Sequence, residues 1–425
     1  MGELSAATIE KTYGLAKKRY AELGVDTDEA LDRLSGVSLS LHVWQGDDVG
    51  GFERPEASLT GGGIMVTGAH PGKARTPEEL RMDLRKAFSL IPGAHRLNLH
   101  AMYGEFGSAP VDRDRIGPEH FETWIEWADG ERLKLDFNAT CFSHPNADSG
   151  FTLSHTDGAV RGFWVEHVKR CREISAAMGR RLGSACIHNL WIPDGSKDSP
   201  VDRWSRRAIL KEALDEIYAI EYAPMEMKDA VESKLFGIGS ESFVVGSHDF
   251  YLAYALSRGK MICLDAGHFH PTESIADKIS AILQFADELL VHVSRGVRWD
   301  SDHVPVLDDQ VRSLMQEIVR SDALGRVHLA TDFFDASMNR IGAWVIGARA
   351  VLQGVLLALL EPREKLRQIE EVGDNFARLA VLEEMKAMPF GAVWDYHCLR
   401  ASVPAASAWI GEVEKYEAEV TARRG

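Results

Sequence analysis

The run Met261-Ile262-Cys263-Leu264-Asp265-Ala266-Gly267-His268 begins as an apolar strand and ends on a carboxylate and an imidazole. Similar short, β-branched runs recur along the first four-fifths of the chain and alternate with stretches of helical spacing, such as residues 81–88, 164–178 and 275–290. The eight runs span residues 37–44, 96–103, 133–140, 184–193, 231–236, 261–268, 289–296 and 327–334. This alternation predicts parallel strands joined by right-handed crossovers. Eight such units predict an α/β fold, a closed (β/α)8 TIM barrel rather than an open sheet.

Polar side chains stand at or near the C-terminal end of nearly every run. They are His42, His100, Asn138, Asn189, Glu232, Lys234, Asp265, His268, His292 and Asp332. In a barrel of parallel strands these ends meet on the face that carries the active site. Any one of them alone is more often a satisfied structural group. The set is different, because random placement would not favour one end of the strands, and it predicts an active site there.

The segment from residue 336 to 425 is almost wholly helical in pattern, with helical stretches at 343–360, 362–388 and 405–422. It is too long to be one barrel helix. We therefore predict a barrel with an N-terminal helix over residues 1–335 and a C-terminal helical extension over 336–425, which packs on the barrel or on a neighbouring subunit. The long connection over residues 45–76 suits a lid or an intersubunit loop.

Composition narrows the class of protein. With 48 basic and 64 acidic residues the chain has a net charge of −16, which repels phosphate backbones and argues against a nucleic-acid partner. The five cysteines are scattered and odd in number, as expected of reduced, buried thiols in a cytoplasmic protein. The N-terminus lacks a signal-peptide pattern. The most apolar stretch, residues 341–360, contains Arg349 and Gln353 and predicts a buried helix rather than a membrane span.

Carboxylates and imidazoles gather in the second half of the predicted barrel. The set comprises Glu232, Asp265, His268, His292, Asp300, Asp302 and Asp332. Five carboxylates cannot share a desolvated pocket without cations, and seven donors suffice for two divalent ions. Oxygen and nitrogen ligands without thiolate suit Mn²⁺ first, with Zn²⁺, Co²⁺ or Mg²⁺ as alternatives. Taken alone, Asp300 and Asp302 are equally consistent with a solvated turn.

Lys234 follows Glu232 by two residues and so shares its face of the strand. It is either a counter-ion to the carboxylates or a group that holds a substrate oxygen, and we favour the second reading. Met102, Trp191 and Phe334 offer an apolar wall for a sugar's methyl group and C–H faces, although Trp191 alone is also consistent with a core position.

Longer motifs around these residues resemble the L-rhamnose isomerase family. They include Leu264-Asp265-Ala266-Gly267-His268-Phe269-His270-Pro271-Thr272 and the stretches 231–239, 292–303 and 332–337, with 44–48, 97–100 and 191–195 upstream. The resemblance covers essentially the whole chain. It implies a homotetramer with two divalent ions per subunit. One ion would be held by Glu232, Asp265, His292 and Asp332, and the other by His268, Asp300 and Asp302. His100, Trp191 and Lys234 match the family's substrate-contacting positions.

The expected activity is a metal-dependent aldose–ketose isomerisation that interconverts L-rhamnose and L-rhamnulose by a 1,2-hydride shift, with Asp332, Lys234 and His100 as catalytic residues. The enzymatic alternative is a metal-dependent phosphodiesterase or hydrolase, which would need a basic groove that the acidic composition does not favour. A metal-stabilised sugar-binding or scaffold protein is the non-enzymatic alternative. It accounts for the ligands but not for the lysine and histidine beside them.

Overall fold

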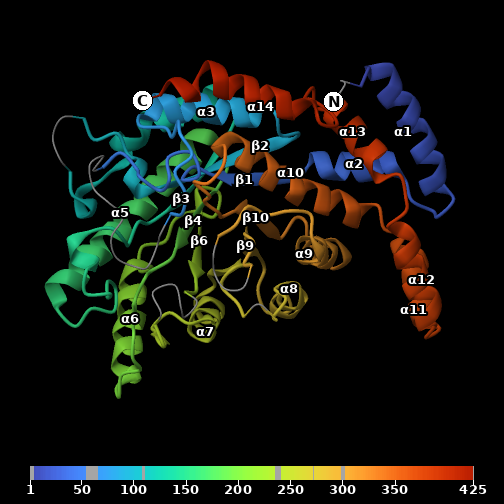
Figure 1. Ribbon diagram of the computed structural model, residues 1–425. Coiled ribbons are helices and arrows are strands. Elements are labelled where there is room, and N and C mark those ends of the chain that lie inside the picture. Colours follow the sequence, from blue (N-terminus) through green and yellow to red (C-terminus); the bar gives the residue numbers. More distant parts are fainter. Residues whose placement is uncertain are drawn as a thin grey trace.

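A computed structural model of the chain describes residues 4–53, 66–107, 111–234, 241–270, 272–297 and 302–424. Eight parallel strands close into a barrel in the order β1-β10-β9-β8-β6-β4-β3-β2 (Figure 1). Their bounds are β1 Ser38–His42, β2 Ala94–His100, β3 Lys134–Asn138, β4 Cys186–Leu190, β6 Met227–Glu232, β8 Met261–Asp265, β9 Leu289–Val293 and β10 Val327–Thr331. Each overlaps one of the eight predicted runs, so the predicted (β/α)8 barrel is confirmed.

Helices surround the barrel, and two more, α1 and α2, precede the first strand (Figure 1). Their bounds are α1 Ala6–Ala21, α2 Thr27–Ser35, α3 Pro77–Phe88, α4 Glu122–Gly130, α5 Gly158–Leu182, α6 Arg203–Ile217, α7 His248–Arg258, α8 Ala276–Ile282, α9 Asp309–Arg320 and α10 Arg340–Leu359. Helix α9 illustrates the local rule. The Asp308 carboxylate accepts from the first backbone N–H groups, and the buried side chains recur at helical spacing, as Val311, Leu314, Met315, Ile318 and Val319.

Two elements of the barrel, β6 and α8, differ from the sequence-based expectation. Strand β6 begins at Met227 rather than near residue 231, because Lys228 and Asp229 find partners: Lys228 pairs with Glu288, and Asp229 with Arg172. Helix α8 ends at Ile282, well short of the expected residue 290. A small antiparallel pair, β5 (Gly195–Ser196) with β7 (Phe243–Val244), lies outside the barrel.

Helix α10 is the one described helix long and apolar enough to cross a membrane, and 83% of its apolar window is buried inside the protein. It packs on α9, α2 and α3 and reaches β1. The expectation of a buried helix is therefore confirmed. Helix α10 is the first helix of the C-terminal segment, and through these contacts it belongs to the outer layer of the barrel. The division of the chain at residue 335 therefore stays a proposal.

The remaining C-terminal helices are α11 Arg363–Glu371, α12 Asn375–Met385, α13 Phe390–Arg400 and α14 Ala408–Glu419, followed by the 3-10 turn η5, Thr421–Arg423. The expected stretch 362–388 is broken at Gly373, which adopts a left-handed backbone with φ +75°. Helix α13 was not predicted. It packs against α1, and the rings of Tyr13 and Tyr396 stack with centroids 3.9 Å apart.

The C-terminal segment also holds the loop that follows β1. His70 Nε2 lies 2.5 Å from the Glu417 carboxylate, and the Arg424 guanidinium donates to the carbonyl oxygen of Gly72 at 3.2 Å. Arg424 and Tyr416 both bind the buried Asp83 carboxylate of α3. Residues near the end of the described chain thus hold the segment that leads into α3.

All five cysteines are buried and free. This matches the expectation of reduced thiols. Burial raises the pKa of the Cys141, Cys171, Cys186 and Cys263 thiols well above their usual range, so they stay protonated.

Candidate metal centre and sugar site

Four predicted ligands converge at the carboxyl end of the barrel. Glu232, Asp265, His292 and Asp332 end or follow strands β6, β8, β9 and β10, and one ligand atom from each lies within 4.8 Å of those of the others. His292 Nδ1 is at their centre, 3.5 Å from Glu232 Oε2, 3.8 Å from Asp265 Oδ2 and 3.2 Å from Asp332 Oδ2. Glu232, Asp265 and His292 are almost fully buried.

The arrangement fits a divalent cation. Within the described residues Asp265 Oδ2 and His292 Nδ1 are buried polar atoms without a hydrogen-bond partner, and such atoms are rare unless an ion or water completes them. Burial, together with the charges of Glu232 and Asp332, raises the pKa of Asp265 to about 7, against the opposing charges of His268 and His292. A bound cation would remove both penalties. The Cys263 thiol lies close enough to Glu232 and His292 to form a second candidate ligand group with them.

Hydrogen bonds hold the Asp265 and Glu232 carboxylates of the cluster in place. Asp265 Oδ1 accepts from the backbone N–H of Gly267 at 2.6 Å and from the Ser294 hydroxyl at 2.8 Å. The Asn189 side-chain amide donates to Glu232 Oε2. The bonds to Asp265 Oδ1 leave Oδ2 facing His292, whereas Glu232 Oε2 both accepts from Asn189 and faces His292. Outer hydrogen bonds of this kind orient metal ligands in proteins.

Trp44 orients the third carboxylate of the cluster, Asp332. Its indole Nε1–H donates to Asp332 Oδ1 at 3.0 Å, while Asp332 Oδ2 faces His292. We expect Trp44→Phe to lower kcat about 10-fold, the loss of one hydrogen bond to a charged group, because Asp332 is then free to rotate. Steady-state kinetics check this. Trp164→Phe is the matched control, since it removes an indole bond to the Asn146 carbonyl. An unchanged kcat in Trp44→Phe would contradict the assignment.

The residues expected to hold the second ion are only partly described. His268 Nδ1 lies 3.3 Å from Glu232 Oε1, which brings it to the edge of the cluster. The carbonyl oxygen of Asp302 accepts from the backbone N–H of Phe334 at 3.1 Å, so Asp302 is tied to the loop after β10. Asp300 lies outside the described residues. The second site therefore stays a prediction.

The predicted sugar-contacting residues lie on loops that follow the strands. Lys234 is buried and donates to the Glu241 carboxylate and to the Pro193 carbonyl, each at 2.7 Å. His100 ends β2, and its ring meets the edge of Trp44 with centroids 4.8 Å apart. Phe142 bridges His100 and Trp191, at 5.6 Å and 6.1 Å. Met102 is buried directly after His100, and Phe334 is half-buried. Their roles stay predictions.

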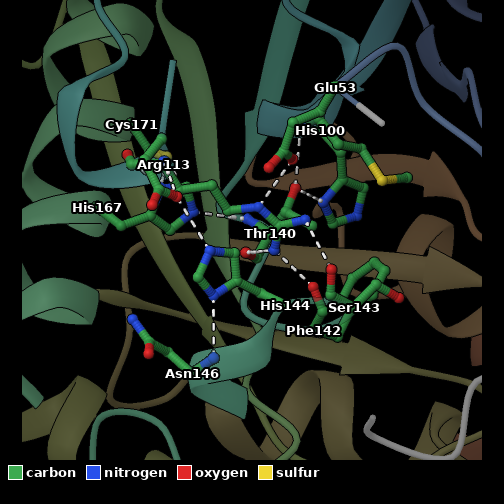
Figure 2. Close-up of polar contacts among 12 residues, drawn as sticks. Glu53, His100, Arg113, Thr140, Phe142, Ser143, His144, Asn146, His167 and Cys171 are labelled. Carbon is green, nitrogen blue, oxygen red and sulfur yellow. Dashed lines mark hydrogen bonds and ion pairs between the residues drawn. The ribbon is translucent and has the colours of Figure 1, made fainter. Parts of the chain in front are cut away.

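Sequence reasoning assigned no role to several residues that shape this rim. Trp44 and Asn189 had visible signals, a motif position and a strand end. Thr140 and Arg113 had none, because they act through backbone carbonyls and a neighbouring imidazole (Figure 2). Only the folded loops bring those groups together.

A closed barrel of parallel strands with carboxylates and imidazoles gathered at its carboxyl end defines a (β/α)8-barrel enzyme with a candidate divalent-metal centre. A family model described as L-rhamnose isomerase (RhaA) matches residues 7–424. An L-rhamnose isomerase of Rhodopirellula baltica is 57% identical over 419 residues, covering 99% of this chain and 98% of the relative. One of Escherichia coli is 55% identical over 417 residues, covering 98% and 99%. The chain belongs to the L-rhamnose isomerase family.

Membership of this family distinguishes the isomerase from the phosphodiesterase or hydrolase alternative. The relatives are named L-rhamnose isomerases, and the match to them covers almost their full length. The phosphodiesterase alternative is therefore not supported.

Proposed function

We propose that this chain is an aldose–ketose isomerase that interconverts L-rhamnose and L-rhamnulose with two divalent ions per subunit, Mn²⁺ being the first candidate. The main support for the proposal is that Glu232, Asp265, His292 and Asp332 converge at one place. Two of their buried atoms, Asp265 Oδ2 and His292 Nδ1, lack hydrogen-bond partners. The family membership supplies the substrate class. Ions held here would withdraw electrons from the first two oxygens of the open-chain sugar.

The protein side of the reaction is positioning and proton transfer. Asp332 is the one member of the cluster with appreciable exposure, with 22% of its side chain accessible. It is therefore the group placed to move a hydroxyl proton. Lys234, with His100, would hold substrate oxygens, and Trp191, Met102 and Phe334 would give the apolar wall for the sugar's methyl group. An added hydroxyl is only weakly rejected by such a wall, so we expect related aldoses to react too.

Hydrogen moves from C2 to C1 of the sugar, and we propose a hydride shift. An ene-diol route needs a base within hydrogen-bond reach of carbon. Glu232 and Asp265 are instead committed to Asn189, Gly267, Ser294 and the cluster.

Turnover of L-rhamnose deuterated at C2, followed by NMR of the ketose, tests the activity and the route together. We expect the deuterium to be retained at C1 in ordinary water, because a hydride shift never exposes the hydrogen to solvent. Washout with normal turnover would replace the hydride shift by the ene-diol route. Absence of turnover with Mn²⁺, Co²⁺, Zn²⁺ and Mg²⁺ would contradict the proposed function itself. Incubation of L-rhamnulose in D₂O without enzyme corrects for spontaneous exchange.

We further propose a homotetramer located in the cytoplasm. Helices α11 and α12 stand away from the barrel at the edge of the molecule (Figure 1), and Val372, Phe376 and Leu379 are exposed there. An apolar surface of this kind supports a contact with another subunit. The five free, buried cysteines support a reducing compartment.

A further inference from the structure

Strands β2 and β3 lie across the barrel from β8 and β9, which carry Asp265 and His292. A network of hydrogen bonds surrounds Thr140 in the loop that follows β3 (Figure 2). It joins His100 at the end of β2, the loop after β3 from residue 139 to 144, the 3-10 turn η2 (Arg113–Arg115), and His167 on α5. None of its members except His100 has a role in the proposed function. The chemistry of the atoms determines which partner donates in each bond.

The two hydrogen bonds of the His167 ring determine which of its nitrogens carries the proton. The backbone N–H of Thr140 can only donate, and it does so to His167 Nε2 at 3.0 Å. That nitrogen is therefore unprotonated. Burial lowers the pKa of His167 to about 3, so the neutral ring carries its proton on Nδ1 and donates it to the Arg113 carbonyl oxygen at 3.0 Å.

Arg113 holds the same loop from the other side. Its guanidinium donates to the carbonyl oxygens of Thr140 at 2.7 Å and Phe142 at 2.5 Å, and its Nε donates to Glu53 Oε2 at 2.9 Å. Arg113 and Glu53 are both almost fully buried in this ion pair. Both backbone groups of Thr140 are thus anchored, and the position of its side chain is set.

The Thr140 hydroxyl then has one possible direction. Its Oγ1 accepts from the backbone N–H of Met102 at 3.3 Å, and it lies 3.1 Å from His100 Nδ1. Thr140 is fully buried, and buried hydroxyl protons are almost always donated to an acceptor. Within the described residues His100 Nδ1 is the acceptor available to it. The hydroxyl therefore donates to Nδ1, and the proton of a neutral His100 is left on Nε2.

His100 is neutral and faces the site. Burial lowers its pKa to about 4, against the opposing charges of Asp332 and Glu232. Its ring packs on Trp44, which binds Asp332, and part of it remains exposed. A neutral imidazole with a proton on Nε2 is a donor for a sugar hydroxyl or carbonyl oxygen.

We propose that Thr140 is a positioning residue, which holds His100 as the tautomer with its proton on Nε2 and so makes it a hydrogen-bond donor to a substrate oxygen. This inference rests on the proposed function, because it takes His100 to be a substrate contact. Arg113 and His167 act one step further out, by fixing the backbone from which the Thr140 hydroxyl points.

A double-mutant cycle tests whether Thr140 acts through His100. We expect Thr140→Val to lower kcat/KM for L-rhamnose about 10- to 100-fold, as losses of supporting hydrogen bonds around a reactive group do, and Thr140→Ser to stay within about threefold of wild type. In a His100→Ala background Thr140→Val should cost less than about twofold, because the partner is already gone. Thr27→Val is the matched control, since it removes another fully buried hydroxyl, bonded to Tyr13.

Two results would overturn the proposal. One is an undiminished cost of Thr140→Val in the His100→Ala background, which means a purely structural role. The other is a joint neutron and X-ray structure of the wild-type protein with deuterium on His100 Nδ1 rather than Nε2. The neutron experiment does not depend on any variant folding. It also stays decisive if wild-type protein fails to turn over L-rhamnose, a result that would contradict the proposed function alone.

Discussion

Replacing Glu232 by glutamine will lower kcat for L-rhamnose by at least about 1,000-fold, a loss of about 4 kcal/mol of transition-state stabilisation of the kind a divalent ion supplies. The Glu232 side chain lies between His268 and His292, 3.3 Å and 3.5 Å from their Nδ1 atoms. Glutamine keeps the shape but removes the charge that balances a cation. We therefore expect the variant to lose its tightly held ion.

Elemental analysis and kinetics after metal stripping and add-back check this prediction together. Wild-type protein should lose activity with a chelator and regain it with Mn²⁺, while Glu232→Gln should regain little at the same concentration. Glu361→Gln is the matched control. That glutamate is also buried but lies just after the end of α10 and binds Arg320 and Gln316, so its replacement should affect stability and leave kcat unchanged. A Glu232→Gln variant that keeps its ions and a tenth of the activity would refute the assignment.

The second large effect concerns stability and lies away from the rim. Arg172 on α5 donates two hydrogen bonds to the Asp229 carboxylate of β6, at 2.8 Å and 2.9 Å, and both side chains are almost fully buried. Lys260 donates to the same carboxylate at 3.1 Å. We expect Asp229→Asn to lower the free energy of unfolding by about 3–5 kcal/mol, since it leaves buried cations without their counter-charge.

Urea unfolding of the variant measures this loss, and Glu166→Gln provides the comparison on the same helix. Glu166 pairs with Arg170 at the surface, and exposed pairs contribute only about 0–1 kcal/mol. Equal effects in the two variants would show that the Arg172–Asp229 pair contributes no more than a surface contact.

The same pair gives a pH dependence of stability. Although burial opposes its ionisation, hydrogen bonds from His188 and Arg172 hold the pKa of Asp229 well below its usual range. A carboxylate with a depressed pKa adds stability that is present above the unfolded-state pKa of about 3.9. That contribution is lost as the pH falls towards the folded-state value. The stability gap between wild type and Asp229→Asn should therefore narrow in acid.

The barrel could be predicted from sequence because its strands are apolar and end in chemically distinctive residues. Strand β6 was placed too late for a physical reason, since Lys228 and Asp229 look like loop residues until Glu288 and Arg172 supply their partners. Helix α13 was missed because Pro389 and Gly391, two residues that disfavour a helix interior, stand at its start.

The candidate site was likewise predictable only in part. Glu232, Asp265, His292 and Asp332 could be grouped because parallel strands bring their carboxyl ends together. The orientation of each group could not be predicted. The bond from Trp44 to Asp332 joins residues 288 positions apart, and the Lys234 ammonium donates to Glu241, a pairing that the strand pattern does not specify. Such pairings depend on loop backbone, which strand and helix periodicity does not specify.

The bonds from Glu417 to His70 and from Arg424 to Gly72 link segments about 350 residues apart in sequence. During synthesis His70 and Gly72 gain these partners only after Glu417 and Arg424 have left the ribosome. Contacts of such long sequence separation form slowly. We therefore expect chaperones in the cell to meet a folding intermediate in which the barrel has formed but these contacts at its rim have not.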